Sequence, residues 1–261
     1  MRGGASGVPH ALALAAALAV TSFAGGARGE TRCDAILGGS RALSDADADA
    51  RLTFVRETMR AQASYAKTWT WAWSAIGFGL AAGQYGLMAI VPAHERFEQA
   101  FEGTAALYIP AAIALQPLRV RGDDERLEEF LTETEVEGPG GSHGGATCLR
   151  LARAEELLAS SAADEALHTN WFQHTLTIVL SGAYAAVLGV AFKNVANVIV
   201  NGGGAVILGE AQLLTTPTGA VSALERYQKG DLTMVAPTPP RVSWTLAPLG
   251  VGPGLAIVAR F

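Results

Sequence analysis

The sequence predicts a mainly α-helical membrane protein, built from a duplicated helical-hairpin unit with flanking amphipathic helices and a short C-terminal β-hairpin. Three observations lead to this fold class. Half of the 261 residues are hydrophobic and only 16% are charged, well below the roughly 25% of ordinary soluble chains. Two uncharged stretches are long enough to cross a bilayer as helices. Features of the first half of the chain also recur about 100 residues later, at a spacing typical of a duplicated unit.

Residues 1–29 have the organisation of an export signal peptide. Arg2 provides the positive start, Ala11–Ala24 is an apolar run, and Ala27–Gly29 offers small residues for cleavage. The apolar run is shorter than a comfortable transmembrane helix. Whether the signal is removed or kept as an anchor, we expect the chain from Glu30 onward to emerge on the non-cytoplasmic, periplasmic side of a bacterial cell envelope.

A charged helix is expected to follow, starting after Ser44 and continuing to about Lys67. Ser44 can accept a hydrogen bond from the first turn, and Asp47 stands at the third position of a capping box. Acids are also favourable near the positive end of a helix. The run Asp45–Asp49 begins like a calcium loop, but Arg56 stands where that loop requires Glu, so calcium binding is excluded.

Each proposed unit then contains one long apolar segment. Trp69–Val91 is uncharged over 23 residues and would form a helix about 34 Å long. In the second half, Thr175–Phe192 is uncharged over 18 residues and follows Trp171. Both stretches are credible membrane spans, with tryptophans at the level where aromatic side chains meet the headgroups.

A shorter apolar segment follows in each unit and is interrupted. Gly103–Leu118 and Asn194–Gly209 are each uncharged over 16 residues, about 24 Å of helix against a hydrocarbon core roughly 30 Å thick. Pro110 interrupts the first segment and Gly202–Gly204 the second. Each is therefore expected to be a broken second span, a re-entrant piece, or part of an apolar core outside any bilayer. The preferred arrangement has four membrane-associated helices.

The match between the two halves sets the expected domain boundaries. The sharpest part of the match places Gly103, Pro117, Glu125 and Arg126 on Gly203, Pro217, Glu225 and Arg226. The sequence then divides into a signal peptide at 1–29, unit 1 at 30–122, an acidic Gly-rich linker at 123–147, unit 2 at 148–232, and a Pro-rich tail at 233–261. Within the tail, Val242–Leu246 and Leu255–Phe261 alternate in polarity around glycines, which favours a β-hairpin.

Two spans per unit leave only Pro92–Glu102 and Lys193–Asn197 as loops on the cytoplasmic side. Each loop contains one cation, so the positive-inside signal is weak. Small residues suitable for close helix contact follow the patterns Gly79-x-x-x-Gly83 with Gly86, and Ala185-x-x-x-Gly189. These patterns favour four helices that pack together.

Cys33 and Cys148 are the two cysteines of the chain. In an oxidising compartment thiols tend to pair, so a disulfide between them is expected. The bridge would close a loop of about 100 residues, worth about 4–5 kcal/mol in the chain-entropy model. The alternative is two unrelated buried thiols. Neither cysteine has a partner at zinc-ligand spacing, so no metal site is expected.

Glu210 is the candidate site residue, because it is the one carboxylate beside the short apolar segment of unit 2. A carboxylate within a bilayer faces a partner, a water-filled cavity or an ion path, whereas a carboxylate at the interface needs none of these. His168 and His174 lie on different faces of a helix and do not form a ligand pair. The glycines at 202–204 lack the third glycine and the acid of a dinucleotide-binding fingerprint.

The sequence contains no recognisable constellation for catalysis, and no cofactor is expected. A net charge of −5 without a basic stripe argues against a nucleic-acid partner, and nucleotide binding is not expected either. The leading hypothesis is a non-enzymatic membrane protein of the cell envelope, with a structural or interaction role, whose partners are the lipid bilayer and either a second copy or another membrane protein. The alternatives are a small transporter or channel with a polar path at Glu210, and a soluble exported helical protein.

Overall fold

The structure is a computed structural model that describes residues 43–136, 143–233, 243–248 and 255–260. The described residues are mainly helical, which confirms the predicted class. The expected signal peptide, Cys33 and the glycine-rich residues 137–142 lie outside the described residues.

Helix α1 (Asp45–Leu87) is a single helix of 43 residues, where the sequence indicated a charged helix followed by a separate apolar one. The capping box is confirmed at its start. The Ser44 side chain accepts a hydrogen bond from the Asp47 backbone and donates one to the Asp47 carboxylate. No Pro or Asn interrupts residues 45–87, so nothing in the backbone chemistry stops the helix between its charged and its apolar part.

The first half of the chain continues through α2 (Arg96–Ala106), α3 (Tyr108–Leu115) and α4 (Val120–Val136). The loop between α1 and α2 therefore ends before Arg96, which corrects the expected loop Pro92–Glu102. Two of the charged residues assigned to that loop, Glu98 and Glu102, are in fact buried on a helix. The stretch 123–136, expected as part of a linker, lies in α4, where Asp123 and Leu127 are fully buried.

The second half of the chain is also helical. Its helices are α5 (His143–His168), α6 (Trp171–Val190), α7 (Val195–Asn197), the π-helix η1 (Val198–Gly202), α8 (Gly203–Leu214) and α9 (Gly219–Lys229). The interruption expected at Gly202–Gly204 therefore takes the form of a π turn that ends where α8 begins. Gly230 ends α9 with φ of 74°, a backbone conformation that glycine adopts without strain.

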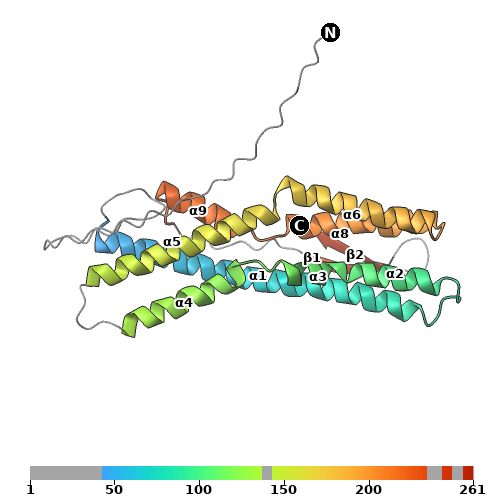
Figure 1. The fold of residues 1–261 in the computed structure, drawn as a ribbon, viewed down its shortest axis with the longest axis horizontal. Helices are drawn as coiled ribbons and strands as arrows, with labels where there is room; N and C mark the ends of the chain where they lie inside the picture. Colours follow the sequence, from blue (N-terminus) through green and yellow to red (C-terminus); the bar gives the residue numbers. More distant parts are fainter. Residues whose placement is uncertain (1–42, 137–142, 234–242, 249–254, 261) are drawn as a thin grey trace, which may run out of the picture.

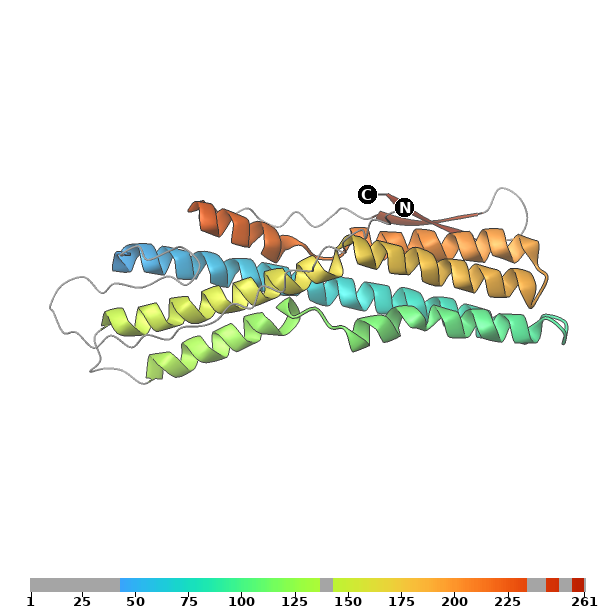
Figure 2. The same cartoon turned by 45° about the horizontal axis from the view of Figure 1, so that its top comes forward.

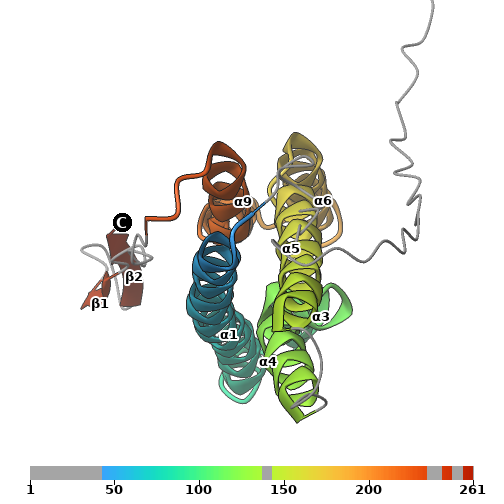
Figure 3. The same cartoon turned by 90° about the vertical axis from the view of Figure 1, so that its left-hand side faces the viewer.

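The helices form an elongated bundle with two halves, which Figures 1 and 2 show end to end. The polar half contains α4, α5, α9 and residues 45–67 of α1. The apolar half contains α2, α3, α6, α7, η1, α8 and residues 68–87 of α1. Viewed along the long axis, the helices of the polar half form a two-by-two cross-section (Figure 3). The polar half is therefore a four-helix bundle, and the apolar half continues from it as two helical hairpins that lie side by side (Figure 2).

The polar half has an ordinary hydrophobic core. Its buried side chains come from all four helices and include Phe54, Val55, Met59, Leu127, Leu131, Leu157, Leu158 and Tyr227. Ion pairs on the outside join Arg56 and Arg60 of α1 to Glu128 of α4. These side chains are partly exposed, so the pairs contribute little to stability. The apolar faces of the helices, not the charges, hold this half together.

The apolar half exposes its large hydrophobic side chains. Among the described residues, every exposed large hydrophobic residue except Leu149 and Leu167 lies between 71 and 115 or between 171 and 214. Trp71, Leu115 and Val190 are 76%, 82% and 79% exposed. Exposed large hydrophobic side chains that are concentrated in this way are typical of a surface that contacts another protein or a membrane. Two helical stretches, Ala146–Val190 and Val195–Lys229, contain windows that are long and apolar enough to cross a membrane.

A polar junction lies where the two halves meet. The indole N–H groups of Trp69 and Trp73 both donate to the hydroxyl oxygen of Thr215, at 3.2 and 3.1 Å. The Tyr65 hydroxyl donates to the backbone carbonyl of the same threonine at 2.8 Å. Thr215 follows the last residue of α8, so these bonds fasten the end of the last apolar helix to α1.

On α1, the close helix contact in the apolar half occurs at a glycine that was not predicted to make one. A Cβ atom on Gly77 of α1 would lie 2.5 Å from Cδ of Pro110 on α3, whereas Cβ atoms on Gly79, Gly83 and Gly86 would meet nothing within 4 Å. The predicted packing face on α1 is therefore wrong for contacts within this chain, because these three glycines lie away from the neighbouring helices.

The predicted packing face on α6 does make contact. A Cβ atom on Gly202 would lie 2.7 Å from the Cβ of Ala185, and one on Gly189 would lie 3.2 Å from the Val198 side chain. The Ala185–Gly189 face thus packs against η1, as expected.

Two short strands follow the helices. Strand β1 (Ser243–Pro248) pairs antiparallel with β2 (Leu255–Arg260), with Ser243 opposite Arg260 and Pro248 opposite Leu255. The residues that connect the strands are outside the described part of the chain.

Candidate functional site

Two carboxylates on α2 face three asparagines at the start of the last apolar helices. Glu98 and Glu102 are four residues apart and therefore share one face of α2. Asn194 is the N-cap residue of α7, and Asn197 and Asn201 follow it at the spacing i, i+3, i+7, in α7 and η1. The fold brings the two groups together, although they are about 100 residues apart in the sequence.

The asparagine amides donate to one oxygen of each carboxylate. Oε1 of Glu98 accepts from Asn194 at 3.0 Å and from Asn197 at 2.7 Å. Oε1 of Glu102 accepts from Asn197 at 3.1 Å and from Asn201 at 2.8 Å. Asn197 therefore bridges the two carboxylates.

Both carboxylates are buried, and neither has a cationic partner among the described residues. Glu98 is 6% exposed and Glu102 is 4% exposed. Within the part of the chain that the structure describes, no ion pair joins either one to Lys, Arg or His. Amide donors lower the cost of burying a carboxylate but provide no opposite charge. The site is therefore suited to a proton or to a positively charged group.

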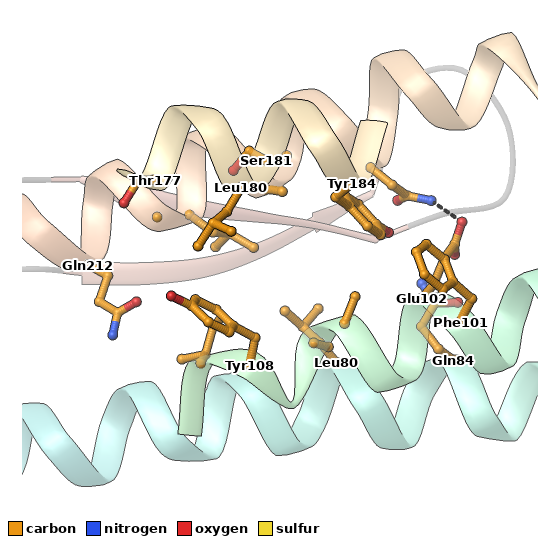
Figure 4. A pocket seen from close by; sticks show the side chains of 18 of the residues that line it. Leu80, Gln84, Phe101, Glu102, Tyr108, Thr177, Leu180, Ser181, Tyr184 and Gln212 are labelled. Atoms are coloured by element: carbon orange, nitrogen blue, oxygen red, sulfur yellow. Dashed lines mark hydrogen bonds between the residues drawn. The ribbon is translucent and has the colours of Figure 1, made fainter. Parts of the chain in front are cut away.

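A cavity of about 430 Å³ opens beside Glu102, between the hairpin of α1 with α2–α3 and the hairpin of α6 with η1–α8. Figure 4 shows Gln84, Phe101, Glu102 and Tyr184 gathered at one end of it, with Thr177 and Gln212 at the other. The walls between the two ends are mainly aliphatic, with Tyr108 and Ser181 also lying there (Figure 4), and include Leu80, Ile109, Leu180, Val200 and Leu208. The cavity is thus mainly apolar along its length and polar at its ends.

Aromatic rings cover the carboxylate end. Phe101 and Tyr184 stack with their ring centroids 5.6 Å apart, and both line the cavity. Oε1 of Gln84, at the same end, is buried and has no hydrogen-bond partner. A ligand that donates a hydrogen bond would satisfy this oxygen.

Glu210, the site residue that the sequence indicated, lies elsewhere. Its Oε2 is 2.7 Å from Nδ1 of His174 on α6. Its neighbours Gly209 and Gln212 line the cavity, but Glu210 is not among the lining residues. The histidine partner is 36 positions away in the sequence, so the pair is visible only in the fold. Whether a polar path passes this residue stays a prediction.

A second, open cleft of about 590 Å³ lies at the boundary between the two halves, on the side of α4. Its cations are Lys67, Arg119, Arg121 and Arg126. Lys67 lies 2.8 Å from Glu125, and Arg126 lies 2.7 Å from Asp123. The cleft therefore places a group of cations at the level where the apolar exterior ends.

No protein-family model, no curated protein and no solved structure matches this chain. The interpretation of the cavity therefore depends on its own chemistry. Among the described residues, no group of three or more His, Cys, Asp or Glu side chains could hold a metal ion.

Of the two cysteines in the predicted disulfide, only Cys148 is described, because Cys33 is outside the described residues. Cys148 on α5 packs against the cluster of Leu43, Ala48 and Leu151. Leu43 is ten residues after Cys33 in the sequence, and the chain therefore passes close to Cys148 soon after Cys33. The pairing stays a prediction.

The carboxylate site was missed in the sequence because the search for spans used uncharged stretches alone. The uncharged segment begins at Gly103, which leaves Glu98 and Glu102 in the loop before it. The i, i+4 spacing of the two acids, with the i, i+3, i+7 spacing of three asparagines 100 residues later, is the signal that could have found it.

Proposed function

We propose that this chain is a non-enzymatic integral membrane protein of the cell envelope, with four apolar helical columns across the bilayer and the polar half outside it. Its role is structural or an interaction with another membrane component. The observation that carries the proposal is the exterior of the apolar half, where large hydrophobic side chains face outward on all four columns. Lipid tails can solvate such an exterior and water cannot.

The lengths of the columns support this proposal. Residues 68–87 of α1, α2 with α3 over 96–115, α6 over 171–190, and α7 to α8 over 195–214 each cover 20 residues. At about 1.5 Å per residue each is about 30 Å long, the thickness of a hydrocarbon core. The first short segment thus gains the missing length by including Glu98 and Glu102, whose Oε1 atoms accept amide hydrogen bonds inside the bundle. The second gains it by continuing through Glu210 to Leu214.

The boundary supports the proposal as well. The tryptophans at 69, 71, 73 and 171 lie at the end of the apolar half that adjoins the polar half. The basic cleft of Lys67, Arg119, Arg121 and Arg126 lies at the same boundary. Aromatic side chains are enriched at headgroup level, and cations there interact with lipid phosphates.

Extraction of the membrane fraction with alkaline carbonate tests the proposal. We expect the protein to stay in the pellet, because four apolar columns hold it in the bilayer. Release into the supernatant would contradict membrane insertion and favour the soluble exported alternative, in which other chains would have to cover the apolar exterior.

The proposed orientation places the polar half on the non-cytoplasmic side, as the export signal at 1–29 implies. Alkaline phosphatase, which is active only outside the cytoplasm, can be fused after residue 233 or after residue 94. We expect activity from the first fusion and none from the second. The opposite pattern would place the polar half in the cytoplasm.

A small transporter or channel is the second candidate function. The cavity between the two hairpins, the break between α2 and α3, and the π turn at η1 favour it, since interrupted helices line substrate paths in transporters. A flux assay in liposomes tests it. A flux that Glu102→Gln and Glu210→Gln both leave unchanged would argue against a path along these carboxylates.

We also propose that the chain is a duplication of one helical-hairpin unit. Gln62 of α1 packs against Gly219 at the start of α9. Asp164 of α5 accepts a 2.8 Å hydrogen bond from the backbone of Arg119, just before α4. At the offsets of 102 and 100 that align the halves, Gln62 corresponds to Asp164 and Arg119 to Gly219. Reciprocal contacts of this kind are typical of a two-fold relationship.

A further inference from the structure

We infer that the cavity between the two hairpins binds an apolar organic cation, with its positive group beside Glu102 and its hydrophobic body along the aliphatic walls. The inference goes beyond the proposed membrane role and rests on it, because the cavity lies in the half assigned to the bilayer. The ligand class is a hydrophobic amine, a quaternary ammonium or a phosphonium ion.

The charge of the ligand follows from the carboxylates. Glu98 and Glu102 are buried, are joined through Asn197, and form no ion pair in the described part of the chain. Each receives two amide hydrogen bonds on Oε1 alone. A cation beside Glu102 would offset the cost of burying a negative charge in an apolar surrounding. A proton on the carboxyl group is the competing way to remove that charge, and the experiment below separates the two.

The aromatic rings at the same end favour an organic cation over a metal ion. Phe101 and Tyr184 line the cavity together with Glu102, and ring faces attract ammonium and guanidinium groups. At the carboxylate end the lining residues include one acid, Glu102, and the neutral amides of Gln84 and Asn201. No set of three metal-ligating side chains is found in the described residues. A desolvated organic cation can use both the rings and the carboxylate.

The walls and the opening indicate that the rest of the ligand is apolar. Tyr108, Leu180 and Val200 line the cavity and are 54%, 40% and 67% exposed, which is too much for side chains that face a closed cavity alone. The cavity therefore communicates sideways with the surface that we assign to lipid. An amphiphile dissolved in the bilayer could enter by this route and leave its charge at the inner end.

Tetraphenylphosphonium and tetraphenylborate test the inference, because the two ions have the same shape and opposite charge. Equilibrium binding is measured with radiolabelled tetraphenylphosphonium on the full chain in nanodiscs, with empty nanodiscs subtracted. We expect saturable binding of the cation and, in a separate titration with labelled tetraphenylborate alone, no saturable binding of the anion; the two ions are not mixed, because together they form an insoluble salt. Saturable binding of both ions with equal affinity, or no saturable binding of the cation, would overturn the inference.

Variants locate the bound cation. Glu102→Gln should weaken cation binding at least tenfold, and Glu102→Asp, which keeps the charge, should restore most of it. Glu95→Gln, just before α2 and outside the cavity, serves as the matched control and should bind like the wild type. Unchanged binding by Glu102→Gln would contradict the inference, and would fit a carboxyl group that is already neutralised by a proton.

Carbonate extraction of the same membranes keeps the two proposals apart. Absence of cation binding with the protein still in the pellet contradicts the ligand inference alone. Release of the protein by carbonate contradicts the membrane proposal itself.

Discussion

Glu102 of α2 accepts a 2.8 Å hydrogen bond from the side-chain amide of Asn201 in η1. This bond crosses from one helical hairpin to the other, as do the three further bonds that Asn194 and Asn197 donate to Glu98 and Glu102. Polar bonds between helices in an apolar surrounding fix which faces meet, since the alternative is an unsatisfied polar group. The carboxylate site therefore has a role in assembly as well as in the ligand binding that we infer.

Glu165 should make the stability of the polar half depend on pH. Burial raises the pKa of Glu165 to about 7, although its Oε2 accepts hydrogen bonds from the backbones of Ala220 and Val221. Since the folded pKa exceeds the ordinary value of 4.5, the protonated form stabilises the fold below pH 4.5. This contribution is lost as the pH rises through 7, and amounts to about 3 kcal/mol.

Hydrogen exchange of α9 in the full chain, reconstituted in nanodiscs, measures this effect. Protection of α9 should fall between pH 5 and pH 8 once the intrinsic exchange rates are removed. Glu165→Gln keeps the acceptor oxygen and should flatten the dependence, whereas Glu57→Gln on the exposed face of α1 should not. An equally steep loss of protection in Glu165→Gln would show that another group is responsible.

Thr215→Val should weaken the junction between the halves. The substitution keeps the shape of the side chain but leaves the indole N–H groups of Trp69 and Trp73 without their shared acceptor. We expect a loss of about 2 kcal/mol, because unsatisfied buried donors are costly. The midpoint of thermal unfolding should fall, Thr215→Ser should restore it, and the exposed Thr218→Val should leave it unchanged. A Thr215→Val midpoint equal to that of the wild type would rule out the role of this hydroxyl.

Gly77→Ala should lower the free energy of unfolding and Gly79→Ala should raise it, although both add one methyl group to the same helix. The new Cβ at Gly77 would be 2.5 Å from Cδ of Pro110, while the one at Gly79 meets nothing within 4 Å. Overpacking costs roughly 1–3 kcal/mol, whereas replacing an open helical glycine by alanine gains up to about 1 kcal/mol. Unfolding in detergent by increasing fractions of dodecyl sulfate measures both, and equal effects would contradict the α1–α3 contact.

Trp71 and Trp73 should respond differently to brominated lipid. Trp71 is 76% exposed and Trp73 is 3% exposed, two positions apart on α1. Bromine quenches indole fluorescence at contact, so lipids brominated on the upper acyl chain should quench Trp71. Trp71→Phe should therefore lower the quenched fraction and Trp73→Phe should raise it. Identical fractions in the two variants would argue that lipid does not surround this surface.

The predicted bridge between Cys33 and Cys148 can be tested on non-reducing gels. Leu43, near Cys33 in the sequence, shares a hydrophobic cluster with Cys148, so only a short segment of chain separates Cys33 from a residue that contacts Cys148. The oxidised wild type should migrate faster than Cys33→Ser, and reduction should remove the difference. Equal mobility before reduction would show that the bridge is absent.

Local signals in the sequence predicted the parts of the fold that depend on local chemistry. The capping box at Ser44 and the close face at Ala185 and Gly189 are both confirmed. A capping box depends on residues a few positions apart in the sequence, and a close helix face depends on the size of single side chains. The sequence did not predict that α1 is one continuous helix, because a change from charged to apolar composition does not by itself end a helix.

The candidate site could not be predicted in the same way, because its parts come from distant segments. Glu210 was identified because it is a carboxylate beside an apolar run, but its partner His174 is on another helix. The sequence predicted Glu98 in the loop Pro92–Glu102, because a membrane span was expected to contain no acid. Acids can stay within an apolar helix when another helix provides donors, and that condition is a property of the tertiary structure.

The unbroken course of α1 has a mechanical consequence. The other three columns of the bundle are interrupted where the halves meet, between α3 and α4, between α5 and α6, and between α8 and α9. α1 alone continues for 43 residues, about 65 Å at about 1.5 Å per residue. It is thus the one column that runs through both halves as a single helix, beside three columns that are interrupted at the junction. A tilt imposed on the polar end of α1 would be transmitted along its length to its apolar end, while the interrupted columns bend at the junction.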